Sequence, residues 1–345
     1  MTATSESQST VAKLDGRLAH VTKEFVHAPW PLVCRVDPAG RYVFVGGTDH
    51  TIQRWEIATG TKTLFSGHTN WVRTLGFSPD GATLYSGGYD GRVISWDAAA
   101  ADPKPGRVIE AHKGDQAHLG WVRSLAVSSD GKWLATGGND HMVRLWSAAD
   151  GKLVREFSGH PHFVFSVIFH PETHDLVSGD LKANIHHWDT KTGALVRKLE
   201  LKQYDMYFDI GDWSHYGGIL GLAFSPDRKI LVASGLQKPT NALTGSQQGV
   251  AHSFDWESGA KARKHETVKE PREAIMWRAL FHASGQLIGS LDPCVGFWQA
   301  EQEDVYHSLE TPSRIHDMDL HPNQVDLFTV HLDGHVRQIR LAAAT

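Results

Sequence analysis

One stretch of this chain repeats another almost position for position. Residues 69–97 (TNWVRTLGFSPDGATLYSGGYDGRVISWD) align without a gap with residues 119–147 (LGWVRSLAVSSDGKWLATGGNDHMVRLWS). The two segments share their apolar positions, an Asp-Gly turn, a Gly-Gly-x-Asp turn and a Trp near the end. A fixed period of about 40 to 45 residues indicates a repeat architecture and takes priority over other fold interpretations.

The same template recurs along the rest of the chain. Its Trp, or the residue in its place, stands at Trp55, Trp96, Trp146, Trp188, Phe254, Trp298 and Ile339. Each of these seven units contains short runs of β-branched and aromatic residues in near alternation, separated by Gly, Asp, Asn and Pro turns. This pattern predicts strands and hairpins without helices, and therefore an all-β fold.

The motifs of the repeat resemble those of the WD-repeat (WD40) family over residues 17–342. They are a His before the unit, an Asp six residues ahead of the Trp, and Trp-Asp pairs such as Trp96-Asp97 and Trp188-Asp189. The resemblance implies a seven-bladed β-propeller in which each blade is a four-stranded antiparallel sheet around a central channel. It also implies that a buried His, Ser or Thr, Asp and Trp form a hydrogen-bonded network within a blade.

Carried onto this chain, the resemblance implies a complete network in two units and partial networks in the others. The complete sets are His68, Ser86, Asp90 and Trp96, followed by His118, Thr136, Asp140 and Trp146. The first unit has Val45 at the hydroxyl position, the fourth has Lys182 where the Asp is expected, and the fifth keeps His215 as its His. Units five to seven depart furthest from the template.

The two ends of the chain fit together in this scheme. The last unit runs out after its third strand, whereas Arg17–Phe25 is placed like the fourth strand of a blade. We therefore expect the N-terminal strand to pair with the last blade, which closes the ring and removes exposed strand edges. Residues 1–16 are expected to form a disordered tail, and residues 17–345 a single propeller.

Three segments are longer than the template requires. Residues 110–120 lengthen a connection between units, 204–218 hold an aromatic-rich acidic stretch, and 236–249 lengthen a turn between strands. By the resemblance, all three open on the same face of the disc, the top. Candidate partner-contacting residues in the second insertion are Tyr204, Tyr207, Phe208 and Trp213, because aromatic residues are enriched at interface centres. The alternative is that these aromatics pack back onto their own blade.

A second candidate group lies just after the repeat His. Aromatic residues stand there in four units, at Trp30, Trp71, Trp121 and Phe163, and Arg73 and Arg123 follow in two of them. The resemblance places these residues at the top opening of the channel, where Trp and Arg are typical of binding hot spots. The alternative is that the Trp residues wedge between adjacent blades.

Composition restricts the setting and the partners. A formal net charge of −5 argues against nucleic acid as a partner. No apolar run is long enough for a membrane span, and the N-terminus lacks the pattern of a secretory signal. Cys34 and Cys294 are too few for a disulfide framework, which favours a reducing, cytoplasmic location.

Motifs for catalysis and cofactors are absent from the sequence. The 22 histidines include no metal-binding motif, and His186 and His187 are neighbours that point to opposite faces of a strand. The Gly-Gly pairs do not open a helix, so we interpret them as tight turns and not as phosphate loops. We expect no catalytic residues, no metal and no cofactor.

The sequence therefore favours a scaffold or adaptor that binds other proteins or peptides on its top face. A small-ligand-binding or metal-binding propeller with hydrolase or lyase activity at the channel mouth is the alternative, and it requires His or carboxylate side chains to converge there. A third hypothesis is a subunit of a larger complex, which an exposed apolar patch away from the long loops would favour.

Overall fold

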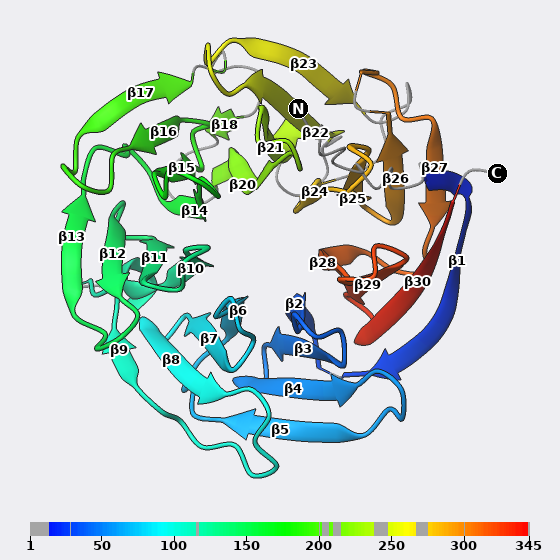
Figure 1. Ribbon diagram of the computed structural model, residues 1–345, viewed down its shortest axis with the longest axis horizontal. Coiled ribbons are helices and arrows are strands. Elements are labelled where there is room, and N and C mark those ends of the chain that lie inside the picture. Colours follow the sequence, from blue (N-terminus) through cyan, green and yellow to red (C-terminus); the bar gives the residue numbers. More distant parts are fainter. Residues whose placement is uncertain are drawn as a thin grey trace, which may run out of the picture.

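In the computed structural model, seven four-stranded antiparallel sheets are arranged as blades around a central channel (Figure 1). The structure describes residues 14–27, 29–114, 117–199, 201, 207–209, 215–237, 248–266, 275–299 and 301–343. The all-β, seven-bladed propeller predicted from the repeats is confirmed.

The blades follow one another in chain order, and each has its first strand innermost. Blade 1 contains β2 (Pro31–Val36), β3 (Tyr42–Gly47), β4 (Thr51–Glu56) and β5 (Lys62–Ser66). Blade 2 contains β6 (Val72–Phe77), β7 (Thr83–Gly88), β8 (Arg92–Asp97) and β9 (Val108–Glu110). Blade 3 contains β10 (Val122–Val127), β11 (Trp133–Gly138), β12 (Val143–Ser147) and β13 (Leu153–Phe157), after a short 3₁₀ turn at Ala117–Gly120.

The second half of the ring has the same plan. Blade 4 contains β14 (Val164–Phe169), β15 (Leu176–Asp180), β16 (Ile185–Trp188) and β17 (Leu195–Leu199). A small hairpin of β18 (Tyr207–Asp209) and β19 (His215–Gly217) precedes blade 5, which contains β20 (Ile219–Phe224), β21 (Ile230–Gln237), β22 (Gln248–Asp255) and β23 (Lys261–Glu266). Blade 6 contains β24 (Ala279–Phe281), β25 (Leu287–Leu291), β26 (Cys294–Trp298) and β27 (His307–Glu310).

Blade 7 combines the two ends of the chain. It contains β28 (Ile315–Leu320), β29 (Asp326–His331), β30 (His335–Ala343) and, as its outermost strand, β1 (Leu14–Val26). The pairing of β1 with β30 confirms the expected closure, and β1 begins at Leu14, three residues before the expected Arg17. Gly16 N also donates to the Tyr306 hydroxyl of blade 6 at 3.0 Å, so the N-terminal strand contacts blade 6 as well as its own blade.

The hydrophobic core lies between the blades. The Trp of one blade packs against the outermost strand of the blade before it, as the edge-to-face pair of Phe65 and Trp96 shows at 5.7 Å between ring centroids. Phe157 of blade 3 and Trp188 of blade 4 make the corresponding contact, at 5.5 Å between ring centroids. Each repeat therefore buries its apolar face only against a neighbour, which is why the units need a ring.

The Gly-Gly pairs have a packing role, which corrects their interpretation as tight turns. They end the second strands of the blades and are not among the residues with positive φ. A Cβ on Gly46 would lie 2.7 Å from Val72 Cγ1, and one on Gly137 would lie 2.7 Å from Val164 Cγ1. Glycine is required because the innermost strand of the next blade approaches the backbone at this point.

A second connection between blades lies at the outer edge of the disc. Long basic side chains on or directly before outermost strands donate to backbone carbonyls in the turn between the third and fourth strands of the following blade. The pairs are Lys23 with Ile57 and Ala58, Arg107 with Ala148 and Ala149, Arg155 with Lys191 and Thr192, and Arg197 with Trp256 and Glu257. In blade 1, Arg54 of the third strand donates to Ala98 O at 2.7 Å and to the hydroxyl of Thr63 on the outermost strand at 3.0 Å. These side chains link neighbouring sheets where no strand pairing joins them.

Candidate functional site at the mouth of the channel

In six of the seven blades, a β-bulge aims one side chain toward the mouth of the channel. In six of the innermost strands the pairing register shifts around the second residue, which is Leu32, Arg73, Arg123, Phe165, Leu220 or His316. A bulge leaves its extra residue out of the ladder and can re-aim that side chain. The repeat thus places a ring of positions at one end of the channel, and their identities differ from blade to blade.

Beside these positions, three aromatic side chains form a stack that contacts Arg123. Tyr89 lies between Trp71 and Trp121, at centroid distances of 5.6 and 4.1 Å, and is nearly parallel to Trp121. The Arg123 guanidinium lies 4.7 Å from the Tyr89 centroid and 4.4 Å from that of Phe165, and burial lowers its pKa. We term Trp71, Tyr89, Trp121 and Arg123 the mouth stack.

Hydrogen bonds fix the orientation of Arg123 further. Its Nε donates to Asn139 Oδ1 at 2.7 Å, and Nη1 donates to the Tyr89 hydroxyl. Asn139 in turn donates to the carbonyl of His118 at 2.8 Å. Tyr89 and Asn139 both occupy the variable position of the Gly-Gly-x-Asp turn, which sequence reasoning did not consider as a site. An aromatic residue in that turn on the top face is the signal that could have found Tyr89.

Arg73 lies on the other side of the mouth and is held more loosely. Its Nη1 donates to Leu32 O at 3.5 Å, and its guanidinium lies 5.6 Å from the Trp277 ring centroid. His316 Nδ1 donates to Pro31 O at 3.0 Å, and burial lowers the pKa of this imidazole. A pocket of about 170 Å³ lies between these groups; Leu32, Trp71, Arg73, Tyr89, Arg123, Phe165, Trp277 and His316 line it.

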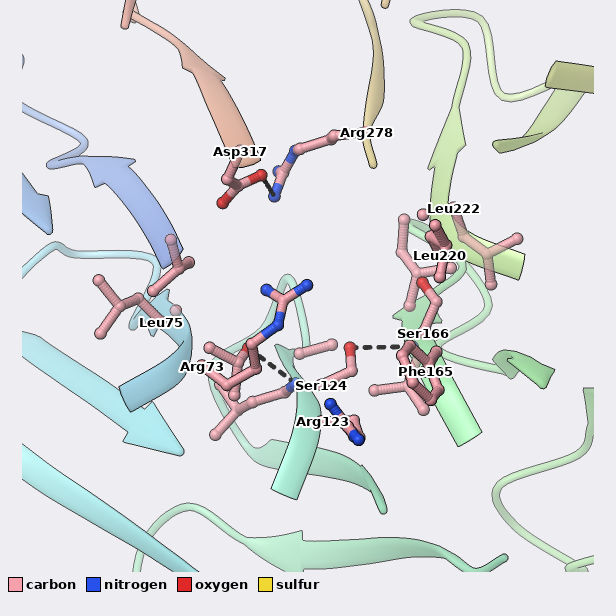
Figure 2. A pocket seen from close by; sticks show the side chains of 18 of the residues that line it. Arg73, Leu75, Arg123, Ser124, Phe165, Ser166, Leu220, Leu222, Arg278 and Asp317 are labelled. Carbon is pink, nitrogen blue, oxygen red and sulfur yellow. Dashed lines mark hydrogen bonds and ion pairs between the residues drawn. The ribbon is translucent and has the colours of Figure 1, made fainter. Parts of the chain in front are cut away.

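Below the mouth, the channel continues as a cavity of about 320 Å³. Figure 2 shows Arg73 reaching into the middle of this space, with Arg278 and Asp317 on the wall across from it. Asp317 lies 2.7 Å from Arg35 and 3.6 Å from Arg278. Burial opposes its ionisation, but the charges of Arg35, Arg278 and Arg73 outweigh that effect, and the pKa of Asp317 lies below its usual value. The deep arginines are therefore paired with a carboxylate.

The hydrogen-bonded network of blade 2 has the arrangement implied by the repeat. His68 Nδ1 donates to Asp90, Ser86 Oγ lies 2.8 Å from His68 Nε2, and Trp96 Nε1 donates to the same hydroxyl at 2.8 Å. Burial disfavours the charged carboxylate, yet the bonds from His68, Thr69 and Arg92 lower the pKa of Asp90 overall. The set is buried and has the role of a brace for the blade.

In blade 3 the imidazole comes from His112 and not from His118, so that assignment was wrong. His112 Nδ1 lies 2.8 Å from Asp140, and its Nε2 lies 2.9 Å from the Thr136 hydroxyl, which also accepts from Trp146 Nε1 at 3.0 Å. The inserted residues follow the network His in this blade, whereas counting back from Trp121 assumed that they precede it. Counting forward from β9 would have found His112, because Glu-Ala-His at 110–112 matches Ser-Gly-His at 66–68.

Blade 4 has a complete network, contrary to the expectation drawn from Lys182. Asp180, two residues earlier, accepts from His160 Nδ1 at 3.1 Å, while Ser178 contacts His160 Nε2 at 2.6 Å and accepts from Trp188 Nε1 at 2.8 Å. Asp180 also accepts from the backbone N of Lys182. The turn has the same length as in blade 2, but the carboxylate comes from the last residue of β15, so a fixed spacing from the Trp misses it.

The other candidate residues are placed apart from the mouth stack or lie outside the described side chains. Trp30 is 55% exposed, and Phe163 packs edge-to-face with His141 and His162. The candidates Tyr204 and Trp213 lie outside the described residues, and of Tyr207, Phe208 and His215 only the backbone in the hairpin β18–β19 is described. The insertion at 236–249 is shorter than expected, because β21 and β22 stay paired to Gln237 and Gln248.

Two kinds of feature are not found in the part of the chain that the structure describes. No three His, Cys, Asp or Glu side chains there are grouped so that they could hold a metal ion. The described residues also contain no helix with the length and hydropathy needed to cross a membrane.

The ring of seven repeated sheets, with a buried His-hydroxyl-Asp-Trp network in three of them, defines a β-propeller of the WD-repeat class. The WD40 family model, described as WD domain, G-beta repeat, matches residues 60–97, 104–147 and 151–189. Three of the seven repeats of this chain therefore match the model of the WD-repeat family.

Curated relatives are similar over part of their length. The nuclear distribution protein nudF of Emericella nidulans is 29% identical over 44% of this chain and 37% of its own. The small ribosomal subunit protein RACK1 and the mitotic checkpoint protein bub-3, both of Caenorhabditis elegans, are 35% and 33% identical over 21% and 24% of this chain. This chain spans 23% and 24% of these two proteins, so the similarity covers the shared repeats.

Proposed function

We propose that this protein is a binding platform for other proteins or peptides, and that it engages them at the top mouth of the channel. The mouth stack carries the proposal. It combines Trp, Tyr and Arg, which dominate binding hot spots, around a pocket that opens on the face with the long loops. Trp71 is 39% exposed although it is part of an ordered stack, so it offers a rigid apolar surface.

The residues at the channel mouth fit the role of an adaptor better than that of an enzyme. The Ser–His–Asp sets of the chain are buried and brace blades in consecutive repeats. The channel mouth presents arginines, aromatic rings and one imidazole whose Nδ1 is used by a backbone carbonyl. We therefore propose binding without a catalytic residue or a cofactor.

Selection of peptides tests the platform directly. Random peptides displayed on phage are selected on the immobilised protein, and the recovered peptides are measured by fluorescence anisotropy against wild type and Trp71→Ala. The matched control is Val325→Ala, because Val325 is 38% exposed and lies in a turn away from the mouth. We expect Trp71→Ala to weaken binding at least tenfold and the control to leave it unchanged. Equal losses in both variants, or no selected peptide, would contradict the proposal.

The aromatic insertion is proposed as an extension of the same surface. Its backbone hairpin β18–β19 precedes β20 and lies beside β21 of blade 5. Replacing Tyr207, Phe208 and Trp213 together by Ala should reduce binding of the selected peptides or of a full-length partner without lowering the melting temperature. A lower melting temperature with unchanged binding would show that these side chains pack onto their own blade.

Apolar side chains at the rim favour a second candidate, a subunit of a larger assembly. Residues on the outermost strands of blades 1 to 4 are 40–52% exposed: Leu64, Val108, Leu153, Val154, Leu195 and Val196. Light scattering of wild type and of a Val154→Asp, Val196→Asp double variant over a range of concentrations tests whether this rim mediates association. A monomeric mass for both proteins at all concentrations would exclude self-association through it.

A further inference from the structure

We propose that the channel mouth selects a peptide by binding the carboxylate of one Asp or Glu side chain between Arg73 and Arg123. The inference rests on the proposed platform function and names the chemistry of the partner segment. It is an acidic side chain on an extended segment, with apolar neighbours against the surrounding rings.

The charges of the channel are unevenly balanced along its length. Deep in the cavity, Arg35 and Arg278 share Asp317, and Arg278 lies 3.5 Å from Asp319 as well. The eight residues that line the mouth include Arg73 and Arg123 and contain no carboxylate. Among the ion pairs of the described residues, neither of these two arginines has a partner. The charge of Arg73 helps to lower the pKa of Asp317, but the two side chains make no ion pair. An anionic group from a ligand would supply a direct partner for both mouth arginines.

Arg123 is organised in advance for such a contact. Its Nε and Nη1 are used by Asn139 and Tyr89, and its plane is held by three aromatic rings, including Trp121 at 4.8 Å. Its Nη2 makes no hydrogen bond to the described residues. A guanidinium that is already fixed loses little side-chain entropy when it binds a carboxylate. The looser contact of Arg73 with Leu32 O leaves this second guanidinium able to adjust to the ligand.

The same arrangement disfavours a cationic ligand. A Lys or methylated Lys side chain needs an open aromatic face, but Arg123 already covers Tyr89, Trp121 and Phe165. A cation would also approach two like charges in a partly desolvated pocket, which is unfavourable. The mouth therefore discriminates by charge as well as by shape.

The size of the mouth pocket suits a single side chain. A volume of about 170 Å³ corresponds to roughly five or six water molecules at about 30 Å³ each. Leu32, Phe165 and Trp277 supply apolar walls beside the two arginines. One acidic side chain flanked by apolar neighbours matches this combination.

Peptide pools with one fixed residue test the inference. Fluorescein-labelled pools of random 11-residue peptides carry Glu, Gln, Lys or phosphoserine at the central position, and their binding is measured by anisotropy at 50 and 300 mM salt. Wild type should bind the Glu pool at least fivefold better than the Gln pool and should not bind the Lys pool. Higher salt should reduce this preference. Arg73→Gln should abolish the preference for Glu over Gln, and Arg73→Glu should shift it toward Lys.

The matched control is Arg228→Gln, because Arg228 is an arginine in a turn at the opposite end of the strands, where it pairs with Glu172. This variant should keep the preference of wild type. Equal binding of the Glu and Gln pools by wild type would overturn the inference and leave the platform function intact. A preference that survives Arg73→Gln, or a phosphoserine pool that binds much better than the Glu pool, would also overturn it. No binding of any pool would contradict both the inference and the platform function.

Discussion

At the scale of single residues, one hydroxyl decides whether the polar core of a blade is satisfied. Ser86 serves both His68 and Trp96, whereas blade 1 has Val45 in the same register position on its second strand. The consequence is visible in blade 1, where the ring nitrogens of His27 and Nε1 of Trp55 are buried without a hydrogen-bond partner among the described residues. Unsatisfied buried polar groups destabilise more than a satisfied pair stabilises.

Removing the hydroxyl from one blade and adding one to the other should therefore change the free energy of unfolding in opposite directions. Ser86→Ala leaves His68 and Trp96 without their shared partner and should lower the free energy of unfolding by about 2 kcal/mol. Val45→Thr keeps the shape of the side chain and adds a hydroxyl, so it should leave that free energy unchanged or raise it by up to about 1 kcal/mol. Urea denaturation at pH 7.5 measures both. A comparable loss in Val45→Thr would show that the hydroxyl is not the deciding group.

Buried histidines make the stability of the propeller depend on pH. Burial is the largest cause that lowers the pKa of His186 and His252 to about 3 and that of His27 and His331 to about 4. An unfolded chain binds these protons near its ordinary pKa of about 6.5. The folded state is therefore fully favoured above pH 6.5 and loses stability as the pH falls from 6.5 toward 4.

We expect the free energy of unfolding to fall below pH 6.5 by up to about 1.4 kcal/mol per pH unit for each such group. His252→Leu should make this dependence shallower, because His252 is fully buried and neither ring nitrogen has a partner among the described residues. Urea denaturation at pH 7.5, 6.5, 5.5 and 4.5 gives both slopes. Identical slopes for the variant and wild type would exclude His252 as a contributor.

At the scale of elements, strand pairing stops at the edge of each blade, and other interactions must join one blade to the next. Apolar contacts between sheets are one such interaction, and the basic side chains at the outer edge are another. Arg155 on β13 donates to the carbonyls of Lys191 and Thr192, in the turn between β16 and β17, at 2.9 and 3.0 Å. Turn carbonyls have no ladder partner, so a charged donor satisfies them well.

Removal of this donor should weaken the contact between blades 3 and 4. Arg155→Met keeps most of the aliphatic stem and should lower the free energy of unfolding by about 1 to 2 kcal/mol. Lys152→Met on the neighbouring turn is the control, because Lys152 is highly exposed and pairs only with Asp150. Amide exchange of β16 and β17 should rise in the first variant alone. An equal rise in amide exchange in both variants would show that the loss of a positive charge, and not of the hydrogen bonds of Arg155, causes the effect.

At the scale of the whole molecule, the ring is closed by strand β1, which is far from its partner in sequence. Phe25 and Leu14 of this strand are buried, and Lys23 connects it to blade 1. Glu24 accepts from Arg337 of β30 at 2.6 Å. Closure therefore combines a ladder, apolar burial and polar contacts to three blades.

Deletion of residues 1–26 should destabilise the whole ring, and deletion of residues 1–13 should not. Loss of the buried side chains of β1 alone removes on the order of 5 kcal/mol, and the exposed edge of β30 should promote aggregation. Thermal denaturation followed by circular dichroism should show a large fall in melting temperature for the longer deletion only. Equal melting temperatures for the two truncated chains would refute closure by β1.

The repeat pattern alone determined the number of blades, the order of strands and the closure, because alternation and turn residues specify strands locally and the period counts them. The resemblance to the WD-repeat family implied that Trp71, Arg73, Trp121 and Arg123 lie at one face. Tyr89 and Asn139 were not considered: Tyr89 stacks on Trp121 of the neighbouring blade, and Asn139 binds Arg123 across its own blade. The assignment to His118 was wrong because an insertion changes sequence spacing without changing spatial position. The assignment to Lys182 was wrong because blade 4 supplies its carboxylate from Asp180, at another position of a turn of the same length.

Only the tertiary structure decided which residues form the site. The bulges that aim Arg73 and Arg123 into the channel lie within single blades. The stacking of Tyr89 on Trp121 and the pairing of Arg35 and Arg278 with Asp317 join residues from different blades. Local sequence specifies each strand through its own backbone and its alternation of side chains. Several contacts that give the mouth its charge and shape join different blades. The sequence of one blade does not specify which side chains of the next blade it meets.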